Sequence, residues 1–327
     1  MSLTNPRGYD VKGIMAQDNK SWTVAEPLAY NRLYKWSGDA VGKNGVISKI
    51  TGSFTTVKPK KIIAANFEYI NDGAIVGIGA PIMLQFHGPV YNKAAAQKML
   101  KVVTDPPTAG SWSWLPPIKS GKENWSRVHW RPKDFWAAGT KVSVSVLVYG
   151  VDYGQGGFGA TDMSLDFRVG RAQMTTADMQ AHSIVVRNGN RILYNFPASF
   201  GLETDKNRIT PVGTYLVMDK YLKTNFNNPR FGYHVKVNWA TRLSNNGVFV
   251  HAYDKTLADQ GVRNVSHGCI NLSTQRATQF YNSSLFGDPV IVTDPGHQAP
   301  QLGSSRDDIY DWTVPWDQWL EGSALHK

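Results

Sequence analysis

The sequence predicts a mainly β protein that is built from several consecutive units. Short segments with alternating or β-branched residues recur along the chain, and Gly, Pro, Asn and Asp separate them. Apolar residues make up 42% of the 327 positions and include 11 Trp, 14 Tyr and 13 Phe, which is ample material for packed cores. A weak repeat, in which Trp and Pro precede a strand that ends in Phe, occurs twice in the first half. We therefore expect tandem β-sandwich units followed by a further β-rich unit.

The two copies of the repeat outline the sandwich units. The first copy begins at Trp22 and ends at Phe54, and the second begins at Trp130 and ends at Phe167. Residues 1–57 are few for a complete seven-stranded sandwich, so we expect the first unit to be truncated. The expected strands of the first half are 47–55, 62–68, 82–86, 127–131, 142–148 and 163–169, with one helix at 93–103.

The pattern of predicted elements changes near Gly170. Residues 182–196 form a predicted hairpin with Asn188-Gly189 at its turn, the strongest short-range hairpin signal. Ser273 can N-cap a helix that has apolar residues at helical spacing. The tail carries Trp312, Trp316 and Trp319 at helical spacing, which predicts that it docks on the preceding domain. The further expected strands are 214–218, 234–240, 247–251 and 289–293, and the expected units are 1–57, 58–169, 170–296 and 297–327.

Composition limits the surroundings in which the chain works. The longest apolar stretch, 73–84, is shorter than the roughly 20 residues of a membrane helix, so we expect no membrane span. The net charge of +10 favours anionic surroundings such as an acidic cell-wall polymer. The basic run at 58–61 is interpreted as a solvated linker, and no nucleic-acid partner is expected. The initial Met-Ser-Leu is similar to an expression leader, so we expect a native signal or lipid anchor to have been removed.

The stretch V-S-H-G-C-I-N-L contains Cys269, the single cysteine of the chain. A lone thiol forms no internal disulfide, which leaves a buried filler, a metal ligand or a nucleophile. His251 and His267 could complete a three-ligand zinc site, although the sequence lacks a CxxC or HExxH spacing there. Gly268 permits a tight turn and places its N–H beside that of Cys269, as a pair of oxyanion donors would require. This pattern favours acyl transfer through a thioester.

A longer motif around this cysteine resembles a known enzyme signature. His251, fourteen further residues and then S-H-G-C-I-N at 266–271 resemble the signature of L,D-transpeptidases with a YkuD-type catalytic domain. Residues 228–233, 239–241, 244–251 and 311–319 are similar to the mycobacterial type, which has N-terminal immunoglobulin-like domains. The resemblance implies two immunoglobulin-like β-sandwich units, the first truncated, then a β-rich YkuD-type catalytic domain with a short helix and a C-terminal tail packed on it.

The resemblance also assigns roles by position. Cys269 would be the nucleophile, His251 the general base, and His267 a neighbour that shapes the site. A backbone carbonyl of Ala252 or Ser266 would orient the His251 imidazole. Tyr233 would lie in a mobile lid over the donor pocket. The residues expected in the catalytic group are Cys269, His251, His267, Gly268 and Ser266, and those expected to bind substrate are Tyr233, Asn271, Gly247 and Phe249.

The chemistry implied by the resemblance is peptidoglycan cross-linking. Cys269 would attack the third residue of a tetrapeptide stem, release D-alanine and form a thioester. The side-chain amine of meso-diaminopimelate on a second stem would resolve the thioester into a 3→3 cross-link. No metal or organic cofactor would be needed, carbapenems would acylate the same thiol, and the protein would work as a monomer in the cell envelope. Two alternatives stay open: a cysteine L,D-carboxypeptidase that uses water as acceptor, and a non-catalytic cell-wall-binding module.

Overall fold

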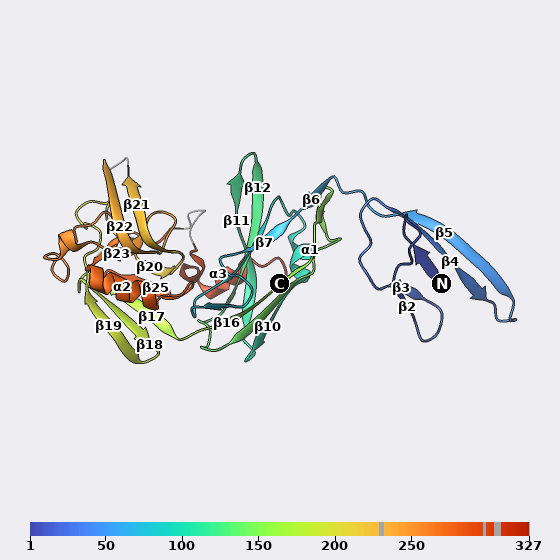
Figure 1. Ribbon diagram of the computed structural model, residues 1–327, viewed down its shortest axis with the longest axis horizontal. Helices are drawn as coiled ribbons and strands as arrows, with labels where there is room; N and C mark the ends of the chain where they lie inside the picture. Colours follow the sequence, from blue (N-terminus) through green and yellow to red (C-terminus); the bar gives the residue numbers. More distant parts are fainter. Residues whose placement is uncertain (229–231, 297–298, 304–308, 327) are drawn as a thin grey trace.

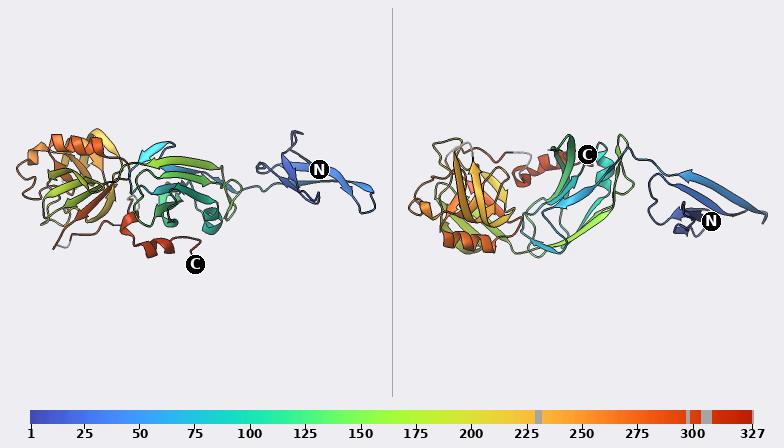
Figure 2. Two further views of the ribbon diagram at one scale, coloured as in Figure 1. Left: turned by 90° about the horizontal axis from the view of Figure 1, so that it is seen from below. Right: turned by 45° about the horizontal axis from the view of Figure 1, so that its top comes forward.

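The computed structural model describes residues 1–228, 232–296, 299–303 and 309–326, and it forms three bodies in a row along its long axis (Figures 1 and 2). The N-terminal body contains strands β1 to β5, the middle body β6 to β16, and the C-terminal body β17 to β25. The N-terminal body has a small core around Leu3, Val11 and Tyr34. Its strands are β1 (Ser2–Thr4), β2 (Gly13–Met15), β3 (Trp22–Val24), β4 (Leu33–Val41) and β5 (Ile47–Thr55).

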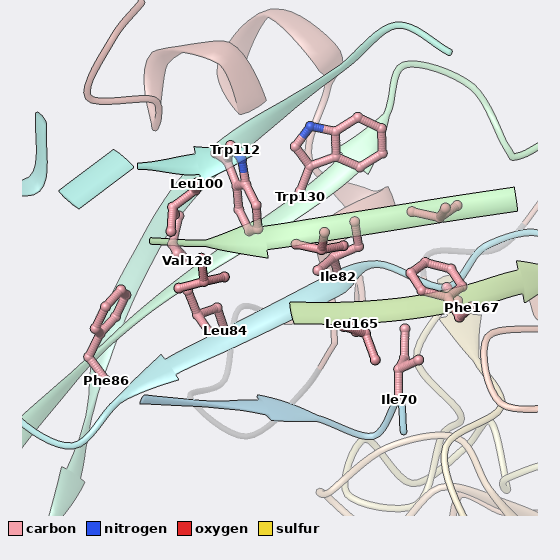
Figure 3. Close-up of a cluster of buried hydrophobic side chains, with 14 of the residues drawn as sticks. Ile70, Ile82, Leu84, Phe86, Leu100, Trp112, Val128, Trp130, Leu165 and Phe167 are labelled. Atoms are coloured by element: carbon pink, nitrogen blue, oxygen red, sulfur yellow. The ribbon is translucent and has the colours of Figure 1, made fainter. Parts of the chain in front are cut away.

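The middle body is a sandwich of two four-stranded sheets, ordered β10-β13-β16-β8 and β11-β12-β9-β7. Alternate residues of β16 point inward, so Leu165 and Phe167 are buried between the sheets (Figure 3). Trp130 belongs to this core, whereas Trp22 packs in the N-terminal body. The elements are β6 (Lys61–Ile63), β7 (Ala65–Glu68), β8 (Ala74–Val76), β9 (Ile82–Phe86), α1 (Lys93–Lys98), β10 (Leu100–Asp105), β11 (Gly110–Ser120), β12 (Glu123–Pro132), β13 (Lys141–Val146), β14 (Asp152–Gly154), β15 (Gly157–Gly159) and β16 (Met163–Val169).

One predicted element of the middle body was wrong. The expected helix at 93–103 ends at Lys98, and the residues after it form β10. Asn92 caps the helix start through its side chain, which accepts a hydrogen bond from the Ala95 N–H at 3.2 Å. Leu100 then pairs with Val146 across the sheet, and the alternating residues of β10 bury one face. Sheet pairing therefore overrides the helical tendency of this segment.

The C-terminal body packs a five-stranded sheet, β19-β18-β17-β25-β20, against a four-stranded sheet, β21-β22-β23-β24, and helix α2. The predicted hairpin is present, but its turn lies one residue further on than Asn188-Gly189, at Gly189-Asn190, since Asn188 pairs with Arg191. Ser273 is the N-cap of α2, and its hydroxyl accepts from the Arg276 N–H at 3.3 Å. The elements are β17 (Gln173–Asp178), β18 (Ser183–Asn188), β19 (Arg191–Pro197), β20 (Gly213–Leu216), β21 (Lys220–Asn228), β22 (Tyr233–Arg242), β23 (Phe249–Ala252), η1 (Asp254–Thr256), β24 (Ile270–Leu272), α2 (Thr274–Ser283) and β25 (Pro289–Thr293).

The middle and C-terminal bodies meet through backbone contacts. The N–H of Gly77 donates to the Phe286 carbonyl at 2.7 Å, and the N–H of Gly79 donates to the Gly287 carbonyl at 2.8 Å. A Cβ on Gly77 would lie 2.3 Å from the backbone nitrogen of Asp288, so only glycine allows this approach. The junction therefore lies within the apolar stretch 73–84. Among the described residues, no helix has the length and apolar character needed to cross a bilayer.

The C-terminal tail was expected to pack on the catalytic domain, and this holds only for its first part, in which Leu302 belongs to the core of the C-terminal body and Ile309 packs with Leu216 and Met218. Its helix α3 (Trp316–Glu321) lies along β11 of the middle body (Figures 1 and 2). Trp319 is 1% exposed, packs against Leu115 and donates its indole N–H to the Ser111 carbonyl at 3.0 Å. The preceding turn η2 (Asp311–Thr313) contacts β20, so the described residues of the tail up to η2 contact the C-terminal body, and α3 contacts the middle body.

Charged groups of the middle body hold the tail in place. The guanidinium carbon of Arg131 lies 4.7, 5.2 and 4.8 Å from the ring centroids of Trp312, Trp316 and Trp319. The side chains of His129 and Asp311 are both fully buried and approach to 3.0 Å. The three tryptophans at helical spacing thus surround an arginine from another body, a partner that the tail sequence alone does not reveal.

Candidate active site

A parallel strand pair brings the predicted site residues together. Strand β23 pairs with β24 so that His251 lies opposite Asn271. Paired residues of neighbouring strands face the same side of a sheet, and Cys269, two residues before Asn271, shares that side. All three line one cavity of about 240 Å³. The described residues that line it are Phe226, Val235, Val237, His251, Tyr253, Thr256, Val265, Ser266, His267, Cys269 and Asn271.

The Cys269 thiol is buried at the base of this cavity, with 8% of the residue exposed. Its Sγ lies 3.3 Å from the carbonyl oxygen of Gly247, to which it donates. Burial raises the pKa of Cys269 to about 12, and a hydrogen bond with the Phe249 backbone only partly offsets this effect. The thiol is therefore protonated at neutral pH, and it needs a base to become a nucleophile.

His251 is the buried imidazole of the cavity, with 5% of the residue exposed. Its Nδ1 lies 3.0 Å from the carbonyl oxygen of Ala252. Because a carbonyl only accepts, Nδ1 carries the proton and Nε2 is left as the basic nitrogen. Burial lowers the pKa of His251 to about 4, so the imidazole is neutral at physiological pH. The same cavity is therefore lined by a neutral base and a neutral thiol.

The alternative orienting group for His251, the Ser266 carbonyl, is engaged elsewhere. It accepts hydrogen bonds from the Leu202 N–H at 3.1 Å and from Arg208 Nε at 3.1 Å. Of the two carbonyls considered from the sequence, only that of Ala252 contacts the imidazole in the described part of the chain.

Ser266 fastens the loop that carries the thiol. Its Oγ donates to the Cys269 carbonyl at 2.6 Å and accepts from the Gly268 N–H at 3.1 Å. Gly268 has φ +112°, which explains the need for glycine at this position. The expectation that the Gly268 N–H points to an oxyanion is corrected, because the Ser266 hydroxyl occupies that N–H. Of the predicted pair of donors, the Cys269 N–H remains for an oxyanion.

The remaining predicted residues surround the thiol in different ways. His267 lies exposed at the cavity rim, and partial burial and the nearby Arg208 charge lower its pKa. The Asn271 side chain, expected to bind substrate, lines the cavity and donates to Thr256 Oγ1 at 3.3 Å. Gly247 supplies the carbonyl that holds the thiol.

Phe249, a predicted substrate-binding residue, is not among the described residues that line the cavity. Phe249 packs with Cys269 in a small apolar cluster and lies 4.6 Å from the Phe226 ring, centroid to centroid. It supports the thiol from the core side. The side chain of Tyr233, at the start of β22, lies outside the described part of the chain.

Sequence reasoning missed the residues that brace the cysteine loop from a distant segment. Thr210 Oγ1 donates to the Gly268 carbonyl at 3.0 Å, and Arg208 donates to the carbonyls of Val265 and Ser266. Both residues belong to a region without a regular strand or helix, and no spacing in the sequence links them to the cysteine. The apolar wall of the cavity could have been predicted from the sequence, because Val235 and Val237 alternate with polar residues along β22.

No metal-binding cluster occurs within the described ranges, where no group of three or more His, Cys, Asp and Glu residues converges. The three-ligand zinc site therefore gains no geometric support.

Comparison with known proteins gives matches over nearly the whole chain. Residues 1–152 match the bacterial Ig domain family, and residues 174–292 match the L,D-transpeptidase catalytic domain family, YkuD. The chain is 44% identical to L,D-transpeptidase 5 of Mycobacterium tuberculosis, over 99% of this chain and 70% of that protein. It is 33% identical to L,D-transpeptidase 2 of the same species, over 99% of this chain and 78% of that protein.

A solved structure of the LD transpeptidase LdtMt1 in complex with imipenem has a similar fold. The two share 29% sequence identity and superpose with a TM-score of 0.57, over 72% of this chain and 100% of that one. The predicted fold class, mainly β with an Ig-like region followed by a YkuD domain, is confirmed. The chain therefore belongs to the L,D-transpeptidase family and is an enzyme, a transpeptidase.

Proposed function

We propose that this enzyme forms 3→3 cross-links between peptidoglycan stems through a thioester on Cys269. The observation that carries the proposal is the single cavity that Cys269 and His251 line together, with the imidazole held in one tautomer by the Ala252 carbonyl. A buried thiol next to a neutral base suits nucleophilic attack on an amide. The residue roles are those implied by the resemblance, with one exception. The N–H of Gly268 is not counted as an oxyanion donor, because it donates to the Ser266 hydroxyl.

The first half-reaction makes the acyl-enzyme. His251 Nε2 takes the Sγ proton as sulfur attacks the carbonyl carbon of the third stem residue. The N–H of Cys269 donates to the oxyanion that develops. The carbon–nitrogen bond then breaks, and D-alanine leaves with the proton that His251 returns to its nitrogen. The thioester and free D-alanine are the products.

The second half-reaction transfers the acyl group. The side-chain amine of meso-diaminopimelate on a second stem attacks the thioester carbon and loses a proton to His251. The carbon–sulfur bond breaks, the proton returns to sulfur, and a new amide joins the two stems. The apolar walls Phe226, Val235 and Val237 favour this outcome, because they limit the access of water.

Carbapenems fit the same chemistry, since their strained amide presents a carbonyl to the thiol. A relative has been solved in complex with imipenem. Attack by Cys269 would open the four-membered ring and leave a stable thioester.

We place the enzyme outside the cytoplasm in the cell envelope, as a monomer, with its units at 1–57, 58–169 and 170–296. The tail 297–327 is assigned to the middle body as well, because α3 packs on β11.

The test is to incubate purified protein with a disaccharide-tetrapeptide and follow the products by mass spectrometry. We expect loss of D-alanine and a cross-linked dimer. Release of free tripeptide without dimer would indicate the carboxypeptidase alternative. No reaction from folded protein would favour the non-catalytic wall-binding module.

A further inference from the structure

A second groove lies on the other side of the strand that walls the active-site cavity. The pairing of β22 with β23 ends at Asn238 and Ala252, so the first half of β22 is paired with β21 on one edge and has no described strand partner on the β23 edge. An open groove of about 420 Å³ occupies this place. Val235 and Tyr253 line both this groove and the cavity of Cys269. The two spaces therefore adjoin at the first half of β22, where the strand has no described partner on the β23 edge.

The groove has a cationic lining. Lys236 on β22 and Lys255 on η1 line it, and both are exposed. Within the described ranges, neither ammonium group has an ion pair. His234 also lines the groove. Because side chains alternate along a strand, β22 presents Val235 and Val237 toward the thiol cavity and Lys236 toward the groove.

The acidic side chain of the groove, Asp254, is already engaged. Its Oδ1 accepts from the Thr274 N–H at 2.8 Å, and its Oδ2 accepts from Thr274 Oγ1 at 2.7 Å. Asp254 thus fastens the start of α2, and both of its oxygens have donors. The two lysines remain as the groups that can recognise an anion.

We propose that this groove binds a carboxylate of the acceptor stem and delivers its amine to the thioester. The inference rests on the proposed function, in which a second peptide must reach the acyl-enzyme. A stem peptide carries carboxylates close to its reactive amine, and Lys236 and Lys255 offer them mobile point charges. The cavity around Cys269, at about 240 Å³, has room for the donor residue, so the acceptor approaches from the adjoining groove.

The experiment compares Lys236→Gln, Lys255→Gln and the double variant with Lys223→Gln. Lys223 is a matched control, because it is exposed on β21 opposite Asn238 and does not line the groove. Each protein is given a fixed donor tetrapeptide and increasing acceptor. We expect the double variant to raise the KM for acceptor about tenfold, as the loss of two exposed charge contacts predicts. D-alanine release and acylation by a carbapenem should stay at the wild-type rate.

Acceptors with a single carboxylate converted to carboxamide then identify the group that is bound. The acceptor that lacks the recognised carboxylate should bind wild-type enzyme about tenfold more weakly and be indifferent to the double substitution. An unchanged KM in the double variant, or an equal rise in Lys223→Gln, would overturn the inference. Loss of carbapenem acylation in the double variant would also overturn it, because the lysines would then serve the donor site. If wild-type enzyme releases D-alanine but forms no dimer, the proposed transpeptidation itself is contradicted, independently of the role given to the groove.

Discussion

The Nδ1 atom of His251 lies 3.0 Å from the carbonyl oxygen of Ala252, the next residue in the chain. This contact sets the proton on Nδ1 and leaves Nε2 as the base. The geometry arises where β23 ends, so the strand end itself supplies the orienting group. A carbonyl can play this part without the negative charge of a carboxylate, and the imidazole stays neutral in its buried position.

The pH dependence of acylation follows from the two buried groups. Burial lowers the pKa of His251 to about 4 and raises the pKa of Cys269 to about 12. General-base attack needs the neutral imidazole and the protonated thiol, and both forms are present between these two values. We expect the rate of acylation by a carbapenem to be flat from about pH 5 to pH 9 and to fall as the pH drops toward 4.

Stopped-flow or mass-spectrometric acylation rates across this range provide the measurement, with circular dichroism at each pH as the control for folding. A rate that rises about tenfold per pH unit through neutrality would mean that free thiolate attacks without a base.

Ser266 is expected to act through the shape of the cysteine loop. Ser266→Ala removes the contacts to the Cys269 carbonyl and the Gly268 N–H, and it leaves both groups without that partner. Losing such buried hydrogen bonds costs about 1–3 kcal/mol, so acylation should slow roughly 10- to 100-fold. Ser266→Thr keeps the hydroxyl and should retain most of the rate. A loss in Ser266→Ala equal to that in His251→Ala would instead place the hydroxyl in proton transfer.

The tail is expected to stabilise the middle body. Trp319 is 1% exposed and packs on β11, so Trp319→Ala should lower the free energy of unfolding of that body by about 3–5 kcal/mol. Gln318→Ala, an exposed change on the same helix, is the control and should alter stability by less than about 0.5 kcal/mol. Differential scanning calorimetry can separate the transitions of the bodies. A shift confined to the transition of the C-terminal body would contradict the observed packing.

Many strands and one helix could be predicted because short local sequence patterns specify them. The expected strands at 47–55, 82–86, 163–169 and 289–293 coincide with β5, β9, β16 and β25, since each alternates or carries β-branched residues between turn residues. The helix after Ser273 was equally clear from its cap. These signals need no knowledge of the rest of the chain.

Features that depend on distant contacts could not be predicted. Strand β10 follows α1 because β13 supplies its partner residues, which lie 36 to 46 positions further along the chain. The tail binds Arg131, which its own helical spacing does not specify. In the site, Cys269 and His251 were found from a motif, but the Ser266 contact to Gly268 and the support from Thr210 depend on how loops meet in space.

The division of roles between His251 and His267 is the central claim about the site. His251 reaches the cavity through strand pairing and is buried, whereas His267 lies exposed at the rim. The direct test is intact-protein mass spectrometry over time with one carbapenem, on folded Cys269→Ala, His251→Ala and His267→Ala. We predict no adduct on Cys269→Ala, acylation slowed by about 10²- to 10⁴-fold in His251→Ala, and an intermediate rate in His267→Ala. Near wild-type acylation of His251→Ala would contradict the assignment and give the base role to His267.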